Sequence, residues 1–254
     1  MIQDSLVIGI DAYKSANRRK GTIFLLLLIA ILQVAVFALY KDISLGIEDK
    51  LLKDVGLGMI LIVGAISGLT AAFQIPTELR ERTAMTLFAK PLGREAYMLG
   101  KLIGVAVNAL KNMFIVGVGV YIVFNFKGTI LSQEFTIGFL QSFLLVFISV
   151  IDLIALTLIL CLFMSEGVVV LTTLCILVLG NAVFMLSYSS TGISAIAGVL
   201  KYVLPNFYLF DIKNEAAANL SISSQYIAFT SLYGIAYAVV ALSIALLVFN
   251  KKDL

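Results

Sequence analysis

Charged side chains that could do chemistry occur in two settings of this 254-residue chain. In the first, Lys111 in "VNALKNMF" and Asp152 in "LVFISVIDLIALTLIL" lie inside long apolar runs, where an ionisable group is costly and usually has a partner. If the runs are consecutive antiparallel helices, a rise of ~1.5 Å per residue places Lys111 ~12 Å and Asp152 ~18 Å from the same membrane face. The sequence therefore predicts a Lys111–Asp152 pair within the membrane. The alternatives are an aqueous cavity around Asp152 and a Lys111 that reaches back to the membrane surface.

The second setting is the stretch "ELRERTAMTLFAKPLGREAYMLGK", Glu78 to Lys101, which lies between two apolar runs. It holds eight of the chain's charged residues, which are 18 basic and 15 acidic. Pro76 suits the first turn of a helix, and Glu78 and Glu81 would then lie near its N-terminus, where the helix dipole favours negative charge. Lys90 and Pro91 should end that helix, and a new one should begin near Gly93 and Arg94. We interpret the segment as a docking surface for a soluble partner; an inner-leaflet helix that binds acidic headgroups is the alternative.

Neither setting has the pattern of an enzyme. The nearest match to a phosphate loop, "GREAYMLGKL" from Gly93 to Leu102, has six residues rather than four before its Gly-Lys, and Leu102 stands where Ser or Thr must hold Mg²⁺. The chain has no histidine, the commonest general base, and no zinc, Ser/His or paired-carboxylate motif. The net charge of +3 comes with no basic tract, which gives no indication of nucleic-acid binding. We expect no catalytic residues, metal or cofactor in this chain.

The composition indicates a helical membrane protein. Hydrophobic residues make up 61% of the chain and charged residues 13%, whereas a soluble domain is about half apolar and a quarter charged. A membrane-crossing helix needs about 20 apolar residues. Six runs qualify, and they predict an all-α fold with six transmembrane helices in a single domain over 1–254: Gly21–Tyr40, Val55–Ile75, Leu102–Phe126, Phe135–Met164, Val168–Tyr188 and Tyr226–Phe249.

The distribution of Lys and Arg predicts the orientation. With the N-terminus inside, 11 basic residues fall in cytoplasmic segments and 6 in external loops, and the cluster "NRRK" directly precedes the first span. Both termini and residues 76–101 are therefore expected in the cytoplasm of a multi-pass protein in the cell (inner) membrane. Residues 189–225 would be external, with short helices on or in the outer face that place Tyr202, Phe207 and Tyr208 at the interface. A re-entrant hairpin is the alternative for this segment.

The N-terminal segment 1–20 is predicted to be an interfacial helix. Ile2, Leu6, Ile10 and Tyr13 recur at helical spacing and form one apolar face. Two further motifs, "GAISG" (Gly64–Gly68) and "GKLIG" (Gly100–Gly104), have the small residues that let helices approach closely, within the bundle or across a dimer. Asn108, Asn112 and Asn181 are expected to bridge helices or to line a cavity.

The order of residues in the segment Glu78–Gly104 resembles the cytoplasmic coupling segment of permeases of ABC transporters of the second exporter type. In that family an acidic residue, a Thr, a Leu-rich turn, a Lys/Arg-Pro, an Arg and a Gly-Lys follow in this spacing. The six-span plan and the amphipathic first helix are similar too. The matching positions here include Thr83, Leu87, Gly100 and Lys101. The expected coupling residues are Glu78, Arg80, Glu81, Arg82, Thr83, Leu87, Lys90, Pro91 and Arg94.

The resemblance implies one transmembrane half of an ATP-driven exporter. Two copies of a separate ATPase would bind ATP and Mg²⁺, and a second copy of this chain or a related permease would complete the path through the bilayer. The stretch "YVLPNFYLFDIKN", Tyr202–Asn214, resembles the branch named for multicopper-enzyme maturation, which includes the nitrous oxide reductase maturation permeases. Copper transport is not expected here, because the chain has no histidine and its two cysteines lie in different spans. Two other classes of function remain: an ion-coupled carrier that uses Lys111 and Asp152, and a non-transporting scaffold for a cytoplasmic partner.

Overall fold

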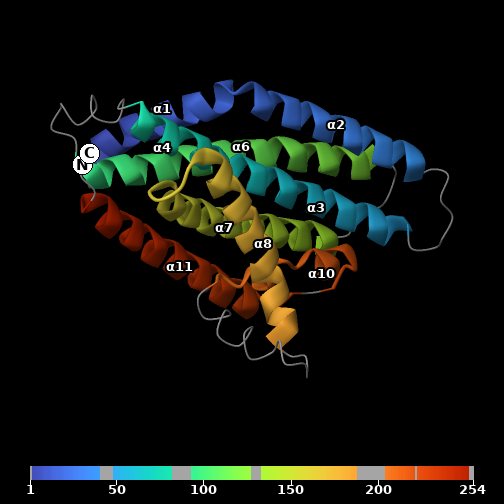
Figure 1. Ribbon diagram of the computed structural model, residues 1–254. Helices are drawn as coiled ribbons and strands as arrows, with labels where there is room; N and C mark the ends of the chain where they lie inside the picture. The colour runs from blue at the N-terminus through green and yellow to red at the C-terminus, as the bar shows by residue number, and fades with distance from the viewer. Residues whose placement is uncertain are drawn as a thin grey trace.

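The protein is all-helical in the part that its computed structural model describes, residues 2–40, 48–81, 93–126, 133–187, 204–220 and 222–251 (Figure 1). Both chain ends lie at the same end of the helix bundle, which we call the terminal end; α1 begins there, α4 and α11 end there, and α6 begins there. The elements are α1 (Ile2–Arg18), α2 (Lys20–Tyr40), α3 (Glu48–Gly68), α4 (Thr70–Arg80), α6 (Arg94–Phe126), α7 (Gln133–Cys161), α8 (Glu166–Ser187), the 3₁₀ turn η1 (Phe207–Phe210), α10 (Lys213–Ala217) and α11 (Ser224–Asn250).

Several helices are long and apolar enough to cross a membrane, which makes this a membrane protein. Four such stretches occur among the described residues: Lys50–Arg80, which joins α3 and α4, Arg94–Val123, Phe135–Cys161 and Ser224–Asn250. α1 and α2 form a fifth if the pair, bent by 59°, is taken as one span, and Glu166–Ala182 of α8 is a shorter apolar helix. Each of the six expected spans lies mostly within helix, although α7 ends at Cys161 and not at Met164, and the second expected span is interrupted at Leu69. Six crossings of the membrane remain a prediction.

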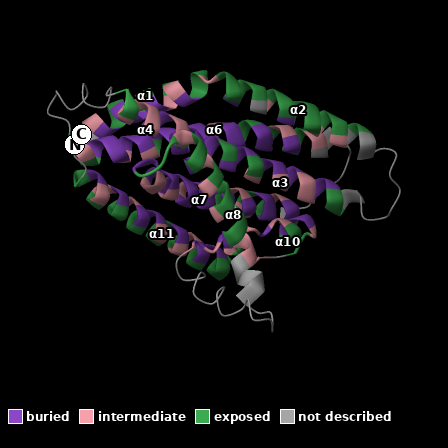
Figure 2. Ribbon diagram, in the orientation of Figure 1, coloured by how far each residue is buried: buried purple, intermediate pink, exposed green. Residues whose placement is uncertain are grey.

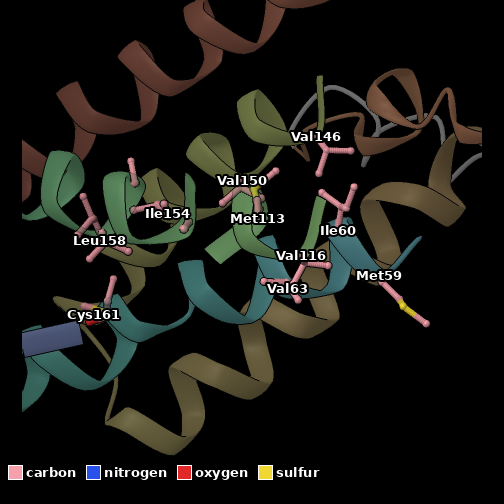
Figure 3. Packing of buried hydrophobic residues seen from close by; sticks show 14 of the residues in the cluster. Met59, Ile60, Val63, Met113, Val116, Val146, Val150, Ile154, Leu158 and Cys161 are labelled. Atoms are coloured by element: carbon pink, nitrogen blue, oxygen red, sulfur yellow. Dashed lines mark hydrogen bonds between the residues drawn. The ribbon is translucent and has the colours of Figure 1, made fainter. Parts of the chain in front are cut away.

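The core lies where α3, α6 and α7 pack together, and it is the buried centre of the bundle in Figure 2. Figure 3 shows its side chains interleaving: Ile60 and Val63 from α3, Met113 and Val116 from α6, and Val146, Val150, Ile154 and Leu158 from α7. The close approach depends on small residues in α3. A Cβ added at Gly64 would lie 2.8 Å from both Met113 and Val150, and one at Gly68 would lie 3.2 Å from Ile154. The "GAISG" motif therefore packs within the bundle.

α1 packs along α6 through the second small-residue motif. A Cβ added at Gly104 would lie 2.3 Å from the carbonyl oxygen of Gly9, and one at Gly100 would lie 2.7 Å from that of Ser5. The face of α1 that is buried is thus its small-residue face. Leu6 and Ile10, on the expected apolar face, are 51% and 54% exposed, so that face is available to lipid. The helix agrees with the sequence, and its position in the membrane interface remains a prediction.

Two expectations about element positions need correction. Pro76 lies in the interior of α4, not in a first turn, because the helix of the second span continues through it to Arg80. Glu78 therefore lies near the C-terminal end of a helix. In contrast, α6 begins at Arg94, as the sequence predicts.

The segment 204–220 contains short helices, as predicted, but they pack on the bundle. Phe207 is buried against α8, where a Cβ added at Gly180 would lie 2.7 Å from its ring, so its side chain packs on the bundle and does not face lipid. Tyr208 is exposed, and Tyr202 lies outside the described residues. Asn219 ends the segment with a positive φ of 54°, a conformation that Asn tolerates well, and its side chain accepts a hydrogen bond from Lys53 at 3.0 Å.

Candidate functional site

The terminal end of the bundle holds a group of charged side chains that connect several helices. Its centre is Glu78 in the last turn of α4. One carboxylate oxygen of Glu78 accepts a hydrogen bond from Lys101 Nζ at 2.5 Å, and the other accepts one from the Tyr97 hydroxyl at 2.7 Å. Tyr97 and Lys101 are four residues apart on α6, which places both on the face that meets α4. Both are buried, so Glu78 supplies the charge that makes a buried lysine tolerable.

A second carboxylate, Glu166, joins α4 to the first turn of α8. It accepts a hydrogen bond from the Thr77 hydroxyl at 2.7 Å and forms an ion pair with Arg80 at 3.4 Å. Its position at a helix N-terminus is favourable for negative charge. Arg19, between α1 and α2, stacks over the Phe73 ring at 5.2 Å. Burial lowers the pKa of Arg19, and the nearby charges of Glu166 and Glu78 oppose that shift.

Arg94, the first residue of α6, holds the end of α11. Its guanidinium donates hydrogen bonds to the backbone carbonyls of Phe249 at 3.0 Å and Asn250 at 2.8 Å. The last carbonyls of a helix have no partner within it, and a cation at that end is favourable. The Phe249 ring stacks on Tyr97 at 5.6 Å between centroids, which links this contact to Glu78.

The nine expected coupling residues therefore divide into groups. Glu78 and Arg94 are half-buried and bind other helices of the bundle, and their part in coupling stays a prediction. Arg80 has a side chain that is 73% exposed, and Glu81 at the end of α4 is exposed, so both face outward. The remaining five lie outside the described residues: Arg82, Thr83, Leu87, Lys90 and Pro91.

A groove of about 270 Å³ lies beside Arg80. Pro76 and Leu79 of α4 form one wall, and the turn between α7 and α8 forms the other. Phe163 in that turn is 66% exposed. Sequence reasoning assigned Phe163 to the fourth span and missed it as a surface residue. The signal was the Ser165 and Glu166 that directly follow, since a polar pair there ends the apolar run.

The predicted Lys111–Asp152 pair does not form. Lys111 donates a hydrogen bond to the Asn17 side chain of α1 and lies 5.6 Å from the centroid of the Tyr13 ring. Asp152 is fully buried, and neither of its carboxylate oxygens has a hydrogen-bond partner. The reason for the error is rotation about the helix axes, which a depth estimate ignores.

Asp152 lies on the face of α7 that meets α11. Ile148, one turn before Asp152, packs against Gly234 of α11 so closely that a Cβ added at Gly234 would clash with the Ile148 side chain. Tyr237 of α11 is within electrostatic reach of Asp152. Lys111 instead faces α1, so the two side chains diverge.

The interior asparagines behave differently from one another. Asn112 donates to the Ser67 hydroxyl at 2.9 Å and so bridges α6 and α3, one of the two expected roles. Asn181 donates to the Leu177 carbonyl of its own helix. Asn108 is buried, and neither polar atom of its side chain has a partner.

No protein-family model matches this chain, and no curated protein is significantly similar to it.

Proposed function

We propose that this chain is the transmembrane permease subunit of an ATP-driven exporter and that a separate cytoplasmic ATPase contacts it at the terminal end. The observation that carries the proposal is the division of charged residues within 76–101. Arg80 and Glu81 face outward, whereas Glu78 and Arg94 bind inward to Lys101 and to the end of α11. A partner that grips the outward residues would therefore pull on α4, α6 and α11 together.

Such a contact moves the bundle only if the partner binds one arrangement of the helices more tightly than another. The inward bonds suit that role because they connect helix ends that must shift together. In this proposal the helices cross the membrane six times, both termini face the cytoplasm, and a second permease copy or a related permease completes the path. ATP and Mg²⁺ bind to the ATPase, which is present in two copies.

The test is purification of the full chain from its native membranes, followed by an assay of what ATPase comes with it. Glu81→Arg is the test variant, since an arginine at the end of α4 suits the helix dipole and leaves the fold intact. Asp11→Arg, at an exposed position of α1, is the matched control. We expect Glu81→Arg to remove most of the associated ATPase activity and Asp11→Arg to leave it unchanged. Purified chain with no ATPase, or an equal effect of both variants, would contradict the proposal.

One observation favours a second candidate, an ion-coupled carrier. A buried carboxyl with two unpartnered oxygens is costly, and Asp152 is such a group. In this candidate Asp152 binds the coupling ion without Lys111. Flux driven by a pH gradient in vesicles that hold the pure chain, abolished by Asp152→Asn, would favour the carrier. An inert complex with a cytoplasmic protein would instead favour a scaffold.

A further inference from the structure

A groove of about 380 Å³ with a mostly apolar lining opens where two helical breaks face each other. One break is the bend between α1 and α2, and the other is the interruption between α3 and α4 at Leu69. The groove is lined by Arg19, Lys20, Gly21 and Thr22 from the first break and by Ile66, Ser67, Thr70 and Phe73 from the second. Its lining includes none of the expected coupling residues, although Arg19 lies near Glu78, and the inference drawn from it does not depend on the proposed function.

The lining suits an anion. Arg19 is fixed on the Phe73 ring, and its charge is partly balanced by Glu166 and Glu78. Lys20 is exposed at the start of α2 and supplies the less compensated positive charge. Ser67 also lines the groove, but it is almost fully buried and its hydroxyl oxygen accepts a hydrogen bond from Asn112.

The groove continues into two apolar stripes. On α2, Ile23, Phe24 and Leu27 are exposed and lie three, four and seven residues after Lys20, which places them on the same face. On α3, Ile62 and Ile66 are 50% and 40% exposed and are one turn apart. The charged lining thus lies at the end of a membrane helix, with apolar surface running from it toward the membrane interior.

We propose that the groove binds an anionic phospholipid, with its phosphate at Lys20 and Arg19 and its acyl chains along α2 and α3. A free phosphate would use the charged lining but leave the apolar stripes without a role. A lipid uses both, and lysine and arginine at the membrane surface attract anionic headgroups. For this reason the assignment is to a lipid and not to a soluble anion.

The experiment is lipid titration of the detergent-purified full chain, with bound lipids counted by native mass spectrometry. The probes are phosphatidylglycerol, phosphatidylcholine with the same acyl chains, and inorganic phosphate. We expect the protein to retain phosphatidylglycerol preferentially, and a large excess of inorganic phosphate to leave it bound. Lys20→Gln should weaken its retention about fivefold, the equivalent of one charge contact of roughly 1 kcal/mol.

Two further variants make the result specific. Lys14→Gln removes an exposed charge from α1 outside the groove and should leave retention unchanged. Ile66→Ser, which keeps every charge, should weaken phosphatidylglycerol binding because it disrupts an apolar stripe. Equal retention of the two lipids, equal losses in Lys20→Gln and Lys14→Gln, or displacement by equimolar inorganic phosphate would each overturn the proposal.

Discussion

Glu78 at the terminal end and Asp152 in the middle of α7 are both carboxylates within the helix bundle, but Glu78 lies among charged and polar side chains, whereas Asp152 is fully buried. Both oxygens of Glu78 are hydrogen-bonded, one to a buried lysine and one to a buried tyrosine. Both oxygens of Asp152 lack a partner. Glu78 therefore connects α4 to α6 and stabilises the fold, whereas the burial of Asp152 opposes folding. A buried ion pair is lost at high cost when one member is removed, whereas an unpartnered polar group is a cost already present.

The largest effect on stability should follow from breaking the ion pair between Glu78 and Lys101. Lys101→Met leaves Glu78 beside an apolar side chain and should lower the free energy of unfolding by about 2–3 kcal/mol, less than the ~3–5 kcal/mol of a fully buried pair because the Glu78 side chain is 23% exposed. Chemical unfolding in detergent measures it. The double variant Lys101→Met with Glu78→Gln should recover most of the loss, because no uncompensated charge remains. If the double variant is as unstable as the single one, the ion pair is not what holds α4 to α6.

A substitution at Asp152, in the middle of the bundle, is expected to raise stability and not to lower it. Asp152→Leu replaces an unpartnered carboxyl with an apolar side chain of similar size and should raise the free energy of unfolding by about 1–3 kcal/mol. The same unfolding assay applies. Asp152→Asn is the control, since its amide would remain without a partner and should bring little of that gain. A loss of stability in Asp152→Leu would show that Asp152 has a stabilising partner and would remove the contrast with Glu78.

The sequence was sufficient to predict where the helices lie along the chain, but not how each helix is rotated about its own axis. The lengths of the apolar runs predicted α2, α6, α7 and α11, and the residues Gly93 and Arg94 predicted where α6 begins. The glycines of "GKLIG" correctly indicated a close helix contact, although not that α1 was the partner. These features are local: an apolar run, a helix start and a small side chain each act within a few residues.

The sequence did not predict which groups Lys111, Glu78 and Arg94 contact, and the reason is the same for all three. Each contact depends on which neighbour lies beside one face of a helix, and an apolar run gives length but no rotation about its axis. Lys111 and Asp152 were matched by depth alone, and the structure turns them toward α1 and α11. The end of α11, which Arg94 binds, is 155 residues away in the sequence, and no local pattern reports such a contact.

A smaller loss of stability is expected when the contact between Arg94 and the end of α11 is removed. Arg94→Gln removes the charged donor from the carbonyls of Phe249 and Asn250 and should lower the free energy of unfolding by about 1–2 kcal/mol, less than Lys101→Met because this site is nearer to water. Hydrogen exchange gives the sharper measurement, since faster exchange should be confined to the last turns of α11. Arg94→Lys keeps the charge and should retain part of the protection. Uniformly faster exchange in Arg94→Gln would indicate general unfolding and not the release of one helix end.

The smallest effect on stability should come from Arg80, although it belongs to the same charged group as Glu78. Its side chain is 73% exposed, and an exposed ion pair such as Arg80–Glu166 contributes only about 0–1 kcal/mol. Arg80→Gln should therefore unfold almost as the unchanged protein does, yet in the proposed transporter it should reduce ATPase co-purification clearly. Lys101→Met, measured in the same unfolding and co-purification assays, provides the comparison. Any loss of associated ATPase in Lys101→Met should result from its loss of stability. An Arg80→Gln protein that is markedly unstable, or one that retains its full ATPase, would contradict this comparison. The outward charges of the segment would then not serve to bind the ATPase while the inward charges stabilise the fold.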